Sequence, residues 1–251
     1  MRSILAFGLA VCLASSAGAA VKIGYGTIPG SNLYPQFNVT TSKQANKTES
    51  FSFGMLTFGG DSLTKINDNI SIGIEVGAGM PMGSYKFDET NYAINVPAGA
   101  DKNQTNAGDT FELNAATATV LAKGVYSMPL GNGIGSLGLG LGTTMVGLLY
   151  ESINQKYDNA TGQTAEDKVT ETGCKFVPLF VIGITPGYAM TVGTDLQLGL
   201  EIPLSIMSTA DVENTETNMN PVNPNVENPQ TRGFEIGGFG WGVNITLTKK
   251  I

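Results

Sequence analysis

The chain has 251 residues, a formal net charge of −7, 33 glycines and no histidine. The missing histidine excludes a Ser-His-Asp triad and a Cys-His pair, and the acidic balance argues against nucleic acid as a partner. Cys12 and Cys174 are the only cysteines, so a zinc site built from Cys and His is excluded as well. We therefore predict a protein that is not an enzyme and that uses no cofactor or metal.

The N-terminal segment has the features of a secretory signal peptide. Arg2 supplies the positive charge, residues 4–14 form a short apolar run, and Ala-Gly-Ala at 17–19 matches the small-x-small cleavage pattern. A retained helical anchor is disfavoured, because a membrane span needs about 20 apolar residues and this run is shorter. We predict a signal peptide over 1–19 and a single domain over 20–251.

The rest of the chain alternates between strand-like stretches and polar connections. In residues 69–83 an apolar side chain recurs at every second position, while Gly73 and Glu75 fall between, which is the period of a strand. The segments 135–150 and 233–248 likewise have one apolar face and one face of small residues. Small residues suit the narrow lumen of a barrel, and an apolar face suits its lipid side. The predicted strands span 20–28, 50–59, 69–83, 111–128, 135–150, 169–186, 194–208 and 233–248.

The connections between these strands are sorted by length, because short ones and long polar ones alternate along the chain. Outer-membrane barrels have short periplasmic turns and long extracellular loops. The sequence therefore predicts an all-β fold, an eight-stranded antiparallel up-and-down transmembrane β-barrel in the outer membrane with periplasmic termini. A barrel of ten strands is the alternative. The short connections are 60–68, 129–134 and 187–193, and the long ones are 29–49, 84–110, 151–168 and 209–232.

Two turn-and-strand stretches resemble small OmpA/OmpW-like outer-membrane barrels. They lie at 187–201 and 68–75, where a polar turn leads into an apolar strand with a central glycine. Gly242, Ile245 and Leu247 resemble the C-terminal assembly signal of such proteins, although the chain ends in Lys-Lys-Ile rather than in an aromatic residue. The resemblance implies outer-membrane lipid, the barrel-assembly machinery and periplasmic chaperones as partners. For the OmpW type it also implies a small hydrophobic solute that leaves sideways into the membrane.

Four charged residues fall on faces predicted to line the lumen: Glu75, Lys123, Lys175 and Glu201. A lysine that faced lipid near the midplane would cost about 2–4 kcal/mol, so these side chains are expected to point inward and pair. One hypothesis is a structural salt-bridge network that fills the lumen. The other is a gate, in which the charges exchange partners and open a narrow path.

The segment 176–182 breaks the alternation, because it is apolar on both faces. Pro178 and Pro186 also lack the N–H that a sheet ladder needs, and Pro81 and Pro203 raise the same problem in two other strands. One interpretation is a hydrophobic plug that packs the lumen, and the other is a bulge or opened seam in the wall. We favour the plug.

Aromatic residues near the predicted strand ends suit the interface girdles of a membrane barrel. They are Tyr25, Phe53, Tyr126, Tyr150, Tyr188 and Trp241. The first function hypothesis is a barrel that supports the envelope or passes small or hydrophobic solutes. The second is an adhesin or ligand-binding barrel that acts through its long acidic loops. The third is a soluble periplasmic β-sandwich.

Overall fold

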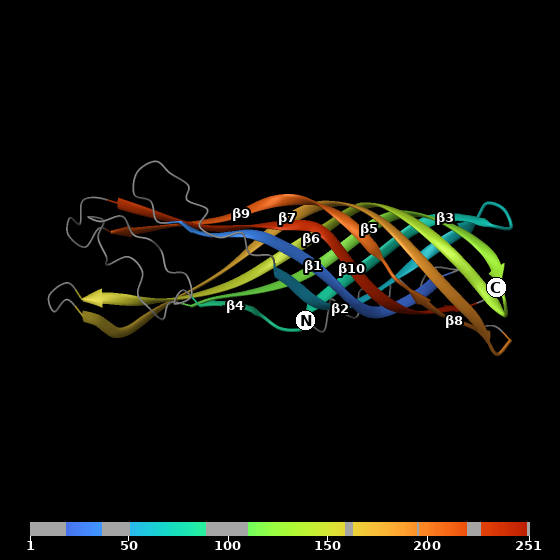
Figure 1. Ribbon diagram of the computed structural model, residues 1–251, viewed down its shortest axis with the longest axis horizontal. Helices are drawn as coiled ribbons and strands as arrows, with labels where there is room; N and C mark the ends of the chain where they lie inside the picture. The colour runs from blue at the N-terminus through green and yellow to red at the C-terminus, as the bar shows by residue number, and fades with distance from the viewer. Residues whose placement is uncertain are drawn as a thin grey trace.

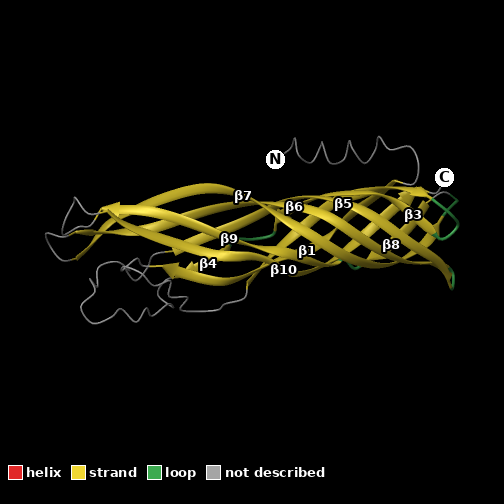
Figure 2. Ribbon diagram, turned by 90° about the horizontal axis from the view of Figure 1, so that it is seen from above, coloured by secondary structure: helices red, strands yellow, loops and turns green. Residues whose placement is uncertain are grey.

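The computed structural model describes residues 19–36, 51–88, 110–158, 163–194, 196–219 and 227–249. Every regular element in these ranges is a β-strand (Figure 2), and they contain no helix long and apolar enough to span a membrane. The predicted signal peptide lies outside the described residues except for Ala19, at which the first strand begins. The strands are β1 (Ala19–Gln36), β2 (Phe51–Lys65), β3 (Ile70–Pro81), β4 (Tyr85–Asp88), β5 (Thr110–Leu130), β6 (Gly133–Asp158), β7 (Gln163–Val192), β8 (Leu196–Glu201), β9 (Leu204–Met219) and β10 (Glu227–Lys249).

The strands close into a ring (Figure 1). β1 pairs antiparallel with β2 on one side and with β10 on the other. β3, β5, β6 and β7 continue the ring in chain order, each antiparallel to the next. β8 and β9 both pair with β7 and with β10, so together they occupy one position in the wall, and β4 pairs with β5 beyond the end of β3. The ten strands therefore make a wall of eight, which confirms the predicted eight-stranded antiparallel barrel.

Prolines interrupt the two divided wall strands. β3 ends at Pro81, and Ile202 and Pro203 separate β8 from β9. Proline has no N–H to donate, so a regular ladder cannot run through these positions. Neighbouring backbone groups bridge the second interruption: the Ile202 N–H donates to Pro186 O and the Gly242 N–H donates to Pro203 O, both at 2.9 Å. The wall therefore stays closed at this level.

On the half that carries the short turns, the wall has the predicted alternation between an apolar outer face and an inner face rich in small residues. Ile72 on β3 is 50% exposed and Leu139 on β6 is 63% exposed, both on the outside. Gly138 and Gly140, on either side of Leu139, lie on the inner face. A closed ring with an apolar exterior suits lipid, because its backbone polar groups pair within the wall. One closed sheet also contradicts the β-sandwich hypothesis.

Several strands are longer than the sequence predicts. β6 and β7 form one long hairpin that continues to residues 158 and 163, and β9 and β10 form another that continues to 219 and 227. The predicted loops at 151–168 and 209–232 are therefore mostly wrong. Their Asn-, Thr- and Glu-rich sequences lack an apolar face, but a paired hairpin beyond the lipid does not need one. β2 likewise continues to Lys65, past its predicted end.

Candidate functional site

Five charged side chains meet inside the barrel, on the half that carries the short turns. They come from five wall strands: Lys22 from β1, Asp61 from β2, Glu75 from β3, Lys123 from β5 and Glu201 from β8. Lys22 Nζ lies 2.8 Å from an Asp61 oxygen and 2.7 Å from an oxygen of both Glu75 and Glu201. Lys123 Nζ lies 3.0 Å from Asp61, 2.7 Å from Glu75 and 3.6 Å from Glu201. We call these five residues the charge cluster.

The charge cluster is a bridged network rather than a set of separate pairs, since each carboxylate reaches both lysines. The side chains of Lys22, Asp61 and Lys123 are at most 5% exposed. Two lysines against three carboxylates leave a net charge of −1 (2 − 3). A buried ion costs several kcal/mol unless partners surround it, so each member depends on the others.

Three of the four predicted lumen charges belong to the charge cluster, and the fourth, Lys175, lies elsewhere. The sequence prediction omits Lys22 and Asp61. The predicted second strand ends before Asp61, which places that residue in a turn. The sequence does carry a signal for Lys22. It stands between Val21 and Ile23, two apolar residues of a strand, so alternation alone predicts that its side chain points inward.

Beside the charge cluster lies a small chamber with a mixed polar and apolar lining. The cavity measures about 170 Å³, and Lys22 and Glu75 are among the residues that line it. The rest of the lining combines glycine, threonine, serine and asparagine residues with apolar ones such as Met55 and Leu121. The hydroxyls of Thr119 and Thr144 share a hydrogen bond of 2.8 Å. A cavity of this size with hydroxyl groups in its lining is large enough to hold water.

Beyond the chamber, toward the long hairpins, apolar side chains fill the lumen. Val146, Leu179 and Ile236 have no exposed surface, so this layer is tightly packed. The position of Leu179 and Val181 in it confirms the plug interpretation of 176–182. We call this layer the apolar plug. It consists of Ile28, Phe51, Phe53, Met55, Leu113, Ala115, Val146, Leu148, Leu179, Val181, Met207, Val212 and Ile236.

Phe53 is therefore not a girdle residue, and that prediction is wrong. Its side chain is only 3% exposed, and its ring packs edge-on against that of Phe51 at a centroid distance of 5.4 Å. Phe53 pairs with Ile28, which also faces inward. Because successive residues of a strand point to opposite faces, only the register of β2 decides the side to which an aromatic points.

The other predicted girdle residues whose side chains the structure describes face outward. Tyr126, Tyr188 and Trp241 are 46%, 36% and 47% exposed, and the ring of Tyr25 lies 5.7 Å from that of Trp241. Tyr126 and Tyr188 are four residues from the turn ends of β5 and β7, whereas Tyr25 and Trp241 lie further along the wall. The side chain of Tyr150 lies outside the described part. A girdle role for these residues stays a prediction.

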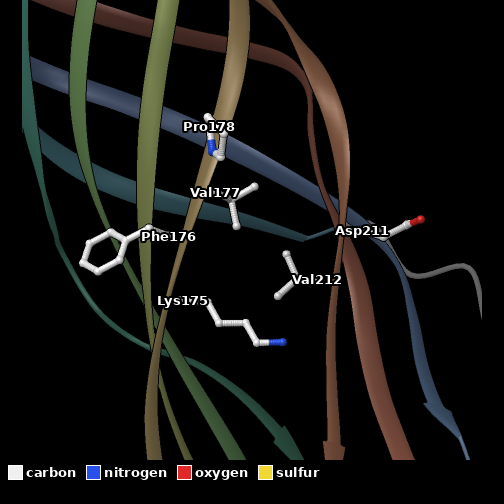
Figure 3. Close-up of a pocket in the computed structure, with 6 residues that line it drawn as sticks. All are labelled: Lys175, Phe176, Val177, Pro178, Asp211 and Val212. Atoms are coloured by element: carbon white, nitrogen blue, oxygen red, sulfur yellow. The ribbon is translucent and has the colours of Figure 1, made fainter.

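The wall parts between β7 and β9. The two strands pair only from Val181 to Ile184, and beyond Val181 β7 pairs with β6 while β9 pairs with β10. The separation leaves a cavity of about 520 Å³ (Figure 3), which we call the notch. The described residues that line it are Lys175, Phe176, Val177, Pro178, Asp211 and Val212.

The free edge of β7 at the notch is adapted to having no neighbouring strand. The Phe180 N–H donates to the Ser208 hydroxyl at 2.9 Å instead of to a backbone carbonyl. Two residues further along the same edge, Pro178 has no N–H, so it leaves no donor unpaired. Both interpretations of 176–182 therefore hold: alternate residues build the apolar plug, and Pro178 stands where the seam opens.

Side chains from both faces of the wall meet at the notch. Figure 3 shows Lys175, Val177 and Val212 pointing into the gap between β7 and β9, with Phe176 directed away across β7. Asp211 points away from the gap on the far side of β9. Lys175 is partly buried, and within the described residues its ammonium has neither an ion pair nor a hydrogen bond.

No protein-family model and no curated protein matches the chain. Solved structures that it resembles include the outer membrane protein OprG of Pseudomonas aeruginosa, with 10% identity, 94% of this chain and 98% of that chain covered, and a TM-score of 0.49. They also include the outer membrane protease OmpT of Escherichia coli, with 12% identity, 94% and 97% covered, and a TM-score of 0.36. The closed wall of eight strands with its apolar exterior decides the class. The chain is a small, closed eight-stranded β-barrel with the apolar exterior of a membrane-spanning wall.

The lumen of this barrel is closed twice in series, by the charge cluster and by the apolar plug. A path along the axis would require both layers to move. Within the described residues, no group of three or more Asp, Glu, Cys or His side chains could hold a metal ion. The notch differs from these layers, because residues of the inner face and residues of the outer face line it together.

Proposed function

We propose that this barrel is not an enzyme and that small hydrophobic solutes move sideways through its wall at the notch. The observation that carries the proposal is the lining of the notch by residues of both faces. Val177 and Val212 belong to the inner face, and Phe176 and Pro178 belong to the outer face. Phe176 is 72% exposed on the outside, so an apolar path continues from the notch toward lipid.

The closed lumen supports a sideways route over an axial one. If the charge cluster opened as a gate, the apolar plug would still close the lumen beyond it. A solute at the notch meets packed apolar side chains on the plug side and an apolar exterior on the other. Displacing the plug would open a cavity, which costs several kcal/mol for each large side chain, whereas the notch is already open.

Orientation and assembly belong to the same proposal. Following the general arrangement of outer-membrane barrels, we place the short turns and the termini in the periplasm and the long hairpins outside. We propose residues 1–19 as a signal peptide and Gly242, Ile245 and Leu247 as the assembly signal. Ile245 and Leu247 are about half exposed on the outer face of β10, where the barrel-assembly machinery and chaperones would meet them before lipid does.

A second candidate is a purely structural role in the envelope. The two layers that close the lumen favour this role, because a barrel with a closed lumen can reinforce the membrane without making it permeable. Surface binding through the loops stays a prediction, since 37–50, 89–109 and 220–226 lie outside the described residues.

The experiment measures uptake of a lipophilic fluorescent dye, N-phenyl-1-naphthylamine, by cells that express the barrel in an intact outer membrane. Val212→Trp fills the notch, and Val177→Trp does so from the opposite strand. Val243→Trp is the matched control, because Val243 lies on the outer face of β10, on a part of that strand that pairs with β1. Heat-modifiable migration on gels shows that each variant is folded.

We expect faster dye uptake with the wild type and with Val243→Trp, and uptake at the level of cells without the barrel for both notch variants. Equal uptake by folded wild type and folded notch variants would contradict the sideways route. Uptake that never exceeds the level of cells without the barrel would favour the structural role instead.

A further inference from the structure

Lys175 is the one predicted lumen charge that lies outside the charge cluster. It follows Cys174 on β7, and its side chain points to the inner face like those of Val177 and Leu179. Figure 3 shows its ammonium extending from β7 into the gap toward β9. Within the described residues no carboxylate pairs with it, and the nearby Asp211 points the other way. A partly desolvated cation beside apolar side chains favours an anionic partner.

The residues around Lys175 indicate the chemistry of the ligand beyond its anionic group. Val177 and Val212 border the same gap, so a group beyond the anion would meet apolar surface on both strands. The volume of about 520 Å³ lies within the usual range for small-molecule sites. Asp211 is exposed on the outer side of the notch. Because its carboxylate repels an anion, the anionic head of a ligand should lie inward at Lys175 and the apolar chain should point outward.

We propose that the notch binds a single-chain aliphatic carboxylate, with its head at Lys175 and its chain between Val177 and Val212, directed past Pro178 toward lipid. This inference rests on the proposed function, since it takes the notch as the place where solutes enter the wall. One ammonium neutralises one carboxylate, whereas a phosphate monoester carries about −1.5 to −2 charges, which a single lysine leaves unbalanced.

The test compares three ten-carbon ligands on the full barrel in amphipol at neutral pH, each below its micelle concentration. Decanoate carries the proposed head, decanol has none and decyl phosphate has the heavier anion. Calorimetry gives the affinities for the wild type, for Lys175→Met and for Lys65→Met. Lys175→Met keeps the apolar stem and removes the charge. Lys65 is the matched control, because it lies near the β2 turn, 64% exposed, with Asp68 as its partner.

We expect the wild type and Lys65→Met to bind decanoate about tenfold to a hundredfold more tightly than decanol, the range for a hydrogen bond to a charged group. Lys175→Met should bring decanoate to the affinity of decanol and leave decanol unchanged. An unchanged ratio in Lys175→Met would overturn the carboxylate site, and so would tighter binding of decyl phosphate than of decanoate.

The two proposals can fail separately. If Val212→Trp stops dye uptake while Lys175→Met leaves the decanoate-to-decanol ratio unchanged, the sideways route stands and the carboxylate site falls. If dye uptake never depends on the notch and Val212→Trp binds all three ligands as the wild type does, the proposed function fails and the inference fails with it.

Discussion

Removing Lys22 from the charge cluster should destabilise the barrel more than removing any other single lysine. In Lys22→Met the apolar stem remains, but three carboxylates lose an ammonium that lay within 2.8 Å of each. The net charge of the buried group changes from −1 to −2 (1 − 3). Breaking a buried ion network by removing one partner costs about 3–5 kcal/mol, because the charges left behind stay buried.

The geometry also ranks the variants. Lys123 has two close carboxylates and a third at 3.6 Å, so Lys123→Met should cost less than Lys22→Met. Glu201→Gln removes the excess negative charge and should cost less than either. In Lys22→Met with Glu201→Gln the two changes should partly compensate, with a coupling energy of about 1–3 kcal/mol.

Equilibrium unfolding in urea, in phospholipid vesicles, measures these free energies. Trp241 is the only tryptophan and lies on the outer face, so its fluorescence reports whether the wall is in contact with lipid. Lys65→Met is the control, since the exposed pair Lys65–Asp68 should contribute at most about 1 kcal/mol. If Lys22→Met and Lys65→Met lowered the unfolding free energy equally, the charge cluster would not stabilise the fold and the reasoning would be refuted.

Three further comparisons test the apolar plug, the closure of the lumen and the backbone of the wall. Leu179→Ala leaves a cavity in the apolar plug and should lower the unfolding free energy by about 2–5 kcal/mol. Leu139→Ala on the outer face should lower it less. Equal losses for the two variants would contradict a packed plug. Glu75→Ala should leave conductance in planar bilayers negligible, because the plug still closes the lumen, so open channels would show that the plug does not seal. Gly237→Ala should lower the unfolding free energy by about 3 kcal/mol or more, since φ is +115° and a Cβ would collide with Ser208 O. Gly131→Ala, at φ +60° in open space, should lower it by about 1 kcal/mol. Equal losses for the two variants in urea unfolding would contradict this reasoning.

The sequence predicts the type of each element correctly, and its errors concern the register and the length of the strands. Phe53 is an aromatic near a strand end, and such a residue points to lipid or to the plug according to the pairing of β2 with β1. Asp61 falls outside the predicted strand, because a charged residue after two glycines is typical of a turn. In the structure that same residue is held within β2 by two lysines from other strands.

Alternation and composition alone determined the class of this protein. A strand with Ile72 and Ile74 on one face and glycine with Glu75 on the other must separate an apolar surface from a narrow interior, and eight such strands predict a closed wall. Only the tertiary structure decided which charges meet. Lys22 and Glu201 lie 179 positions apart in sequence and are brought together by ring closure, whereas Lys175, on an equally inward position, has no partner at the notch among the described residues. A two-residue period specifies which face a side chain points to, but its height along the barrel axis depends on strand stagger, which arises only when the ring closes.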